Sequence, residues 1–81
     1  MNGIDNKVAV LNRSIWSMEM KNLTRKFVRD RMPAAMKKDD GSRGVMGYRE
    51  GKIVLFDRDV VGKQYVYDDA EALLDDGWVV D

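Results

Sequence analysis

Two β-rich runs joined by a short connection containing glycine constrain the fold more than any other feature. Residues 45–48 and 52–56 are rich in apolar side chains, and they flank residues 49–51, which end in Gly51. This spacing predicts a β-hairpin, because glycine readily takes the backbone angles of a tight turn. Residues 64–67 alternate tyrosine with other side chains and predict a third strand of the same antiparallel sheet.

The segment after this third strand predicts a short helix and a final strand. Asp68 is positioned to accept hydrogen bonds from free backbone N–H groups, and Glu71 follows three residues later, as in a capping box. The helix is expected over residues 70–76, and Gly77 is placed to end it. Residues 78–80 predict an edge strand, with the Trp78 side chain packing on the helix.

The N-terminal part allows two interpretations. Residues 7–11 and 15–20 could form two short strands, but an apolar stripe at helical spacing continues past residue 20. The stripe consists of Trp16, Met20, Leu23 and Phe27. We therefore expect a helix that begins near Ser14 or Asn22 and ends at Met32, before Pro33. Residues 34–36 are expected to add one more helical turn after the proline.

These segments predict an α+β fold in a single domain, residues 1–81. Residues 1–36 are expected to be mainly helical and to pack on a small antiparallel sheet of three to four strands. Residues 37–44 are interpreted as a loop, and residues 45–81 as three strands, a short helix and a last strand. The predicted core consists of Val10, Leu11, Trp16, Met20, Leu23, Phe27, Ile53, Leu55, Val66, Leu73 and Trp78.

The formal charge is zero overall but is divided between the two halves of the chain. Residues 1–44 contain ten Lys/Arg and five Asp/Glu, a net charge of +5. Residues 45–81 contain four Lys/Arg and nine Asp/Glu, a net charge of −5. A small domain with opposite charges on its halves is better suited to docking than to catalysis.

The sequence contains no cysteine and no histidine. Their absence removes thiolate nucleophiles, cysteine zinc sites and the commonest general base near neutral pH. No Gly-rich phosphate loop is present, and the serines have no histidine partner. We therefore expect a protein that is not an enzyme and that holds no metal or cofactor.

A row of basic residues on the expected N-terminal helix is the first candidate binding site. Lys21, Arg25 and Arg29 recur every four residues, on the side opposite the apolar stripe. Like charges at this spacing repel weakly, so the helix does not need them for stability. They would suit phosphates or an acidic protein surface, and the alternative interpretation is a solvated helix face.

Carboxylates around the short C-terminal helix are the second candidate. Asp68, Asp69 and Glu71 lie at its positive N-terminus, where a structural role explains them. Asp75 and Asp76 lie at the negative end, where carboxylates are mildly unfavourable. This pair could engage a basic partner, and the alternative interpretation is a contribution to solubility.

Two further patterns favour structural roles. Residues 57–68 have the acidic spacing of a calcium loop, but Val61 stands at a ligand position and strands flank the segment, so we interpret its start as a turn. Tyr48, Tyr65 and Tyr67 could stack bases on an exposed sheet. A domain of this size needs most of its aromatic side chains for packing, which favours a core role.

In general style the chain resembles the small accessory proteins that bacteriophages encode to redirect host machinery. The features that carry this resemblance are the hairpin 45–56, the strand 64–67 and the ending 67–78. The resemblance implies a viral protein-binding module, an inhibitor or adaptor of a host nucleic-acid-processing or defence complex. The alternatives are a nucleic-acid-binding regulator that uses the basic helix and a self-associating, homo-oligomeric structural protein.

The sequence also bears on location. No apolar run approaches the ~20 residues that a membrane-spanning helix needs. Residues 1–7 are polar and contain no apolar signal core. We therefore expect a cytoplasmic protein without membrane contact.

Overall fold

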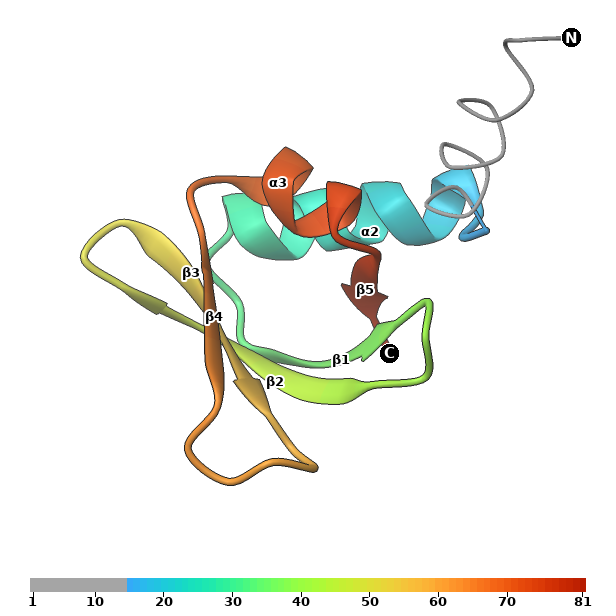
Figure 1. The fold of residues 1–81 in the computed structure, drawn as a ribbon. Helices are drawn as coiled ribbons and strands as arrows, with labels where there is room; N and C mark the ends of the chain where they lie inside the picture. The colour runs from blue at the N-terminus through green and yellow to red at the C-terminus, as the bar shows by residue number, and fades with distance from the viewer. Residues whose placement is uncertain (1–14) are drawn as a thin grey trace, which may run out of the picture.

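The computed structural model describes residues 15–81, which form two helices and a five-stranded sheet. The elements in chain order are α2 (Met18–Arg29), β1 (Ala34–Lys38), β2 (Arg43–Arg49), β3 (Lys52–Asp57), β4 (Gln64–Tyr67), α3 (Ala70–Asp75) and β5 (Trp78–Val80). All neighbouring strands are antiparallel, in the spatial order β4-β3-β2-β1-β5. Both helices lie on the same side of the sheet (Figure 1). The predicted α+β class is confirmed, and the sheet has one strand more than the upper expectation.

The sheet is strongly curved, so its two edge strands approach each other. Three strands separate β4 from β5, which in a flat sheet places them about 19 Å apart. The rings of Tyr65 on β4 and Trp78 on β5 nevertheless lie with centroids 6.1 Å apart. Helix α3 connects these two strands and covers the opening between them (Figure 1).

The hairpin, the third strand and the final strand lie where the sequence predicts them. Glu50 and Gly51, with φ of 53° and 77°, make the tight turn between β2 and β3. Helix α3 ends one residue earlier than expected, and Gly77 follows with φ of 94°. The predicted N-cap was wrong by one residue. Asp69, not Asp68, accepts the hydrogen bond from the Ala72 N–H, at 2.8 Å.

Strand β1 contradicts the expected helical turn at residues 34–36 and part of the expected loop at 37–44. Ala34 pairs with Met46 of β2, and Met36 lies between Gly44 of β2 and Val80 of β5. This inner strand forms a hairpin with β2 and also pairs with β5, a partner distant in the sequence that the local pattern did not reveal. The loop shrinks to the turn that connects Lys38 to Arg43.

Helix α2 begins between the two expected starts and ends earlier than predicted. Ser17 is its N-cap, accepting a hydrogen bond from the Met20 N–H, so the strand interpretation of residues 15–20 was wrong. The helix ends at Arg29 because Arg31 turns into the left-handed region, with φ of 56°. The Arg31 and Met32 N–H groups then donate to the Val28 and Phe27 carbonyls, a Schellman ending. The Tyr48 hydroxyl lies 2.8 Å from the Met32 carbonyl and reinforces this ending.

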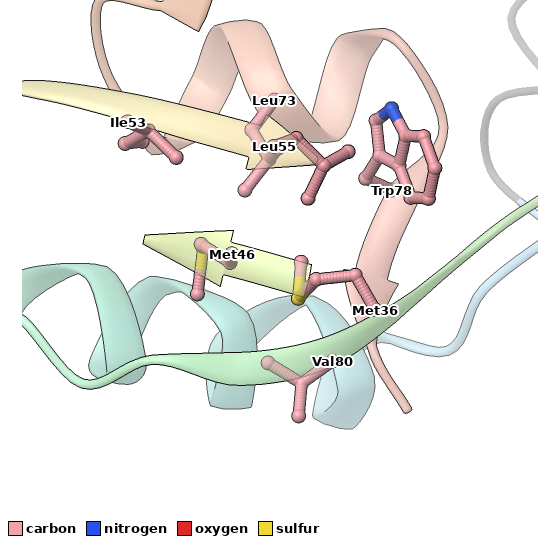
Figure 2. Packing of buried hydrophobic residues seen from close by; sticks show 7 residues of the cluster. All are labelled: Met36, Met46, Ile53, Leu55, Leu73, Trp78 and Val80. Atoms are coloured by element: carbon pink, nitrogen blue, oxygen red, sulfur yellow. The ribbon is translucent and has the colours of Figure 1, made fainter. Parts of the chain in front are cut away.

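The core lies between the curved sheet and the helices (Figure 2). Its buried cluster consists of Met36, Met46, Ile53, Leu55, Leu73, Trp78 and Val80. Ile53, Leu55, Leu73 and Trp78 confirm the prediction. Met36 was missed because β1 was not expected, and Met46 was missed although its strand was predicted. Val66 and Leu23 are exposed, contrary to prediction. Trp16 and Met20 are partly buried, Phe27 packs against the cluster, and Val10 and Leu11 lie outside the described residues.

The face of α2 that packs inward is centred on Thr24, which is fully buried. Its hydroxyl donates to the Met20 carbonyl at 2.8 Å and accepts the Val80 N–H at 3.0 Å. The helix thereby covers the outer edge of β5, and the buried face is rotated from the predicted apolar stripe toward Thr24 and Val28. This rotation leaves Leu23 in solvent.

Thr24→Val is expected to lower the free energy of unfolding by about 1–3 kcal/mol, because the buried Val80 N–H loses its acceptor while the side-chain volume hardly changes. Thr24→Ser, which keeps the hydroxyl, is the control and should retain most of the stability. Urea titration followed by circular dichroism measures both. A valine variant as stable as the serine variant would contradict the edge-capping role.

Candidate protein-interaction surface

The opposite charges of the two halves meet within the protein. Arg25 of α2 donates from Nε and Nη2 to the two carboxylate oxygens of Glu71 on α3, at 2.8 and 3.0 Å. Lys38 lies 3.8 Å from Asp76, and Lys52 forms an ion pair with Asp68. Lys37 and Arg43 lie 3.7 and 3.4 Å from the carboxylate of Asp81. Many of the opposite charges on the two halves of the sequence therefore form ion pairs with each other within the fold.

The three predicted basic residues do not form one free row. Lys21 and Arg25 flank the buried Thr24 and are partly buried themselves, so the row is not opposite the packed face. Arg25 pairs with Glu71, and Arg29 Nε lies 3.3 Å from its neighbour Asp30. Electrostatic pairing across the two helices accounts for the central residue of the row.

The two predicted acidic residues also contribute to the domain itself. Asp76 accepts a hydrogen bond from the Tyr67 hydroxyl and lies near Lys38. Burial, and then the hydrogen bond to this carboxylate, raise the pKa of Tyr67. Asp75 is exposed on α3 and also takes part in an interaction within the protein. Neither carboxylate marks a surface free of internal contacts.

The structure confirms the structural interpretations of the acidic segment that begins at Asp57 and of the three tyrosines. One Asp57 oxygen accepts the N–H groups of Asp59 and Val60, at 2.7 and 2.9 Å, and shapes the turn between β3 and β4. Tyr48, Tyr65 and Tyr67 pack against the core cluster on the helix-covered side, so they form no exposed stacking platform. Among residues 15–81, no group of three or more acidic side chains is arranged to hold a metal ion.

Folding is expected to become weaker in acid, because internal contacts lower the pKa of four carboxyl groups. The causes are the Ser42 N–H group for Asp40, the Val60 and Asp59 N–H groups for Asp57, the Lys52 ammonium for Asp68 and the Arg25 guanidinium for Glu71. The unfolded chain then binds more protons than the folded one near and below the ordinary values of about 4.

The stabilisation from these carboxylates is therefore fully present above about pH 5 and is lost as the pH falls through 4 toward the lowered values. Urea unfolding between pH 7 and pH 2 should show this loss, and Glu71→Gln should reduce its size. Stability that is flat or rising over this range would contradict the assigned ion pairs.

The outer face of the sheet is the surface that the sequence did not reveal. Strand register places Val45 beside Phe56 and Val54 beside Val66, on the sheet face opposite that of the core residues Ile53 and Leu55. Val45, Phe56 and Val66 are 43%, 41% and 55% exposed, although Val54 between them is buried. A methyl group at Gly47 would lie 3.6 Å from the Phe56 ring, so this ring leans over the glycine. We call Val45, Val54, Phe56 and Val66 the outer apolar patch.

Cations border the outer apolar patch at both ends. Lys37 pairs with Arg43 across β1 and β2, and Arg49 pairs with Lys52 across β2 and β3. Asp81 and Asp68 each neutralise part of this charge. Four cations against two carboxylates leave the border net positive, around an apolar centre.

Comparison with protein-family models, curated proteins and solved structures finds no match for the chain. In the part of the chain that the structure describes, no helix is both long and apolar enough to cross a membrane.

Proposed function

We propose that this chain is a non-enzymatic protein-binding module that engages its partner through the outer apolar patch. The observation that supports the proposal is the exposure of large apolar side chains in one contiguous group on a sheet face that neither helix of residues 15–81 covers. Contiguous exposed apolar surface on a small domain is typical of an interaction site. The narrower role of a phage-encoded inhibitor or adaptor of a host complex stays a prediction from the sequence.

The border of the patch indicates the chemistry of the partner. Arg43 and Arg49 lie at opposite ends of β2, with Val45 and Gly47 between them. Arginine at the rim of an apolar centre favours a surface with complementary negative charge. The proposed partner is therefore a protein segment that presents apolar side chains flanked by aspartate or glutamate.

The arrangement of aromatic and basic residues favours protein over nucleic acid. Phe56 is the aromatic side chain of the outer apolar patch, whereas the three tyrosines of the sheet pack on the other side. Single-stranded nucleic acids are bound on several exposed aromatic rings that stack successive bases. The predicted basic row offers no continuous phosphate track either, because Arg25 is held by Glu71.

Selection of a displayed random peptide library on the immobilised protein tests this proposal. We expect enriched peptides to combine apolar residues with flanking Asp or Glu. Val45→Lys, in the patch, should abolish their binding by placing a charge in the apolar centre. Val61→Lys is the matched control, because Val61 lies in the β3–β4 connection and is 99% exposed.

Circular dichroism should first establish that both variants fold. Binding that survives Val45→Lys but is lost on changing Lys21, Arg25 and Arg29, or Asp75 and Asp76, would overturn the proposal and favour the helical surfaces. Salt-sensitive binding of an RNA or DNA oligonucleotide, with no peptide enriched, would favour the nucleic-acid alternative.

A further inference from the structure

The two edge strands of the sheet differ in whether their outward-pointing backbone groups are hydrogen-bonded. At the β5 edge, the Val80 N–H is bonded to the Thr24 hydroxyl, and α2 lies alongside. At the β4 edge, no described residue outside β3 bonds to the backbone of residues 64–67. A strand edge without backbone partners presents its N–H and C=O groups to another chain. Strand β4 contains no proline that would block such pairing.

The outward-pointing groups of β4 belong to Gln64 and Val66. The Asp57 N–H donates to the Lys63 carbonyl at 3.0 Å, so this pair is hydrogen-bonded. Hydrogen-bonded pairs alternate along an antiparallel ladder. The backbone groups of Tyr65 and Tyr67 therefore point to β3, and those of Gln64 and Val66 point to the free edge.

We propose that β4 pairs with β4 of a second copy of this chain, antiparallel and about a two-fold axis through Val66. In this register the two Val66 residues exchange backbone hydrogen bonds, and each Gln64 lies opposite Asp68 of the other copy. The two sheets then join into one. This inference does not depend on the proposed partner of the outer apolar patch, since it uses the backbone edge.

The charge distribution along β4 favours this antiparallel arrangement. Lys63 precedes the strand, and Asp68 and Asp69 follow it. An antiparallel pair places the Lys63 end of each copy beside the acidic end of the other, whereas a parallel pair would bring like charges together. Val66, which is 55% exposed, would meet its own counterpart and extend the apolar row that starts at Val54.

The proposed contact is small. A strand of four residues is about 13 Å long, so the interface lies in the size class of weak, transient complexes. We therefore expect dimers that form and dissociate rapidly and whose fraction rises with protein concentration.

Introduced cysteines test the register, because the natural chain has none. Residues opposite each other in a hydrogen-bonded antiparallel pair have Cα atoms about 5.5 Å apart, within the range of a disulfide. Val66→Cys should form a covalent dimer under mild oxidation about tenfold faster than Val61→Cys or Val45→Cys, because pairing raises the effective thiol concentration. Crosslinking of Val66→Cys no faster than of the more exposed Val61→Cys would overturn the proposal.

Sedimentation equilibrium of the unmodified protein provides the second test. Val66→Pro removes an N–H that the β3–β4 ladder does not use, so the variant should fold but remain monomeric. Val66→Thr keeps the N–H and should dimerise like the natural protein. A natural protein that stays monomeric up to millimolar concentration, or a folded proline variant that dimerises equally well, would contradict the assignment. Gln64→Pro also removes an edge-facing N–H but lies outside the outer apolar patch, so loss of dimers in this variant without loss of peptide binding separates this inference from the proposed function.

Discussion

Replacing Trp78 by alanine is expected to lower the free energy of unfolding by about 3–5 kcal/mol, the usual cost of deleting a buried tryptophan side chain. Trp78 is fully buried in the core cluster. It also links the two edges of the curved sheet, because its ring lies against Tyr65 and its Nε1–H donates to the Tyr67 hydroxyl at 3.0 Å. The substitution therefore removes packing and a hydrogen bond from the place where the sheet curls.

Small domains commonly have total stabilities of about 5–15 kcal/mol, so this loss is a large part of the whole. Denaturant titration followed by circular dichroism measures it. Trp16→Ala is the control, because Trp16 is only partly buried, although its Nε1–H also donates a hydrogen bond, to the Gly77 carbonyl at 2.7 Å. Equal destabilisation by the two substitutions would contradict the central position of Trp78.

Gly77→Ala is expected to be the second most damaging of these substitutions. Gly77 has φ of 94°, which costs a residue with a side chain roughly 1–3 kcal/mol. A methyl group there would also lie 2.5 Å from a carboxylate oxygen of Asp39. The Asp39 backbone is held by its N–H, which donates to the Gly77 carbonyl at 3.1 Å, so the Asp39 side chain would have to rotate to relieve this contact.

Gly41→Ala separates the two causes. Gly41 has nearly the same φ, 92°, but a methyl group there would meet nothing within 4 Å. Both alanine variants should therefore lose stability, and thermal unfolding should show a clearly larger loss for Gly77→Ala. If the two losses are equal, the contact with Asp39 adds no cost, and the backbone angle alone explains the need for glycine.

The elements predicted well are those determined by neighbouring residues. Glu50 and Gly51 make the tight turn that the spacing of two β-rich runs indicates. Gly77 ends α3 where a glycine after a short helical segment is expected to. The signals for these elements lie within a few residues of the structures they produce, so a single sequence is sufficient to locate them.

The elements that were missed depend on contacts between distant segments. Strand β1 is held by β2 and by β5, whose Val80 lies 44 positions beyond its partner Met36. The inward face of α2 is set by the bond between Thr24 and Val80, not by the largest apolar side chains. Local periodicity therefore placed Leu23 in the core and overlooked Met36 on β1.

The candidate site in the structure differs from the predicted charged residues for a similar reason. The charge counts show a basic and an acidic half of the sequence, but they could not show that Arg25 and Glu71 would meet across two helices. A signal for the outer apolar patch was present in residues 53–56, a continuous apolar run. Successive residues of a strand point to opposite faces, so such a run places apolar side chains on both sides of the sheet.

We propose that the outer face of the sheet, and not the charged helices, is the interaction surface. Nuclear magnetic resonance titration of the isotope-labelled protein with a peptide selected on it tests this claim most directly. We expect the largest amide shift changes in β2, β3 and β4, around Val45, Phe56 and Val66, with little change in α2. Shift changes concentrated around Lys21, Arg25 and Arg29 of α2, or around Asp75 of α3, with the sheet unaffected, would contradict it.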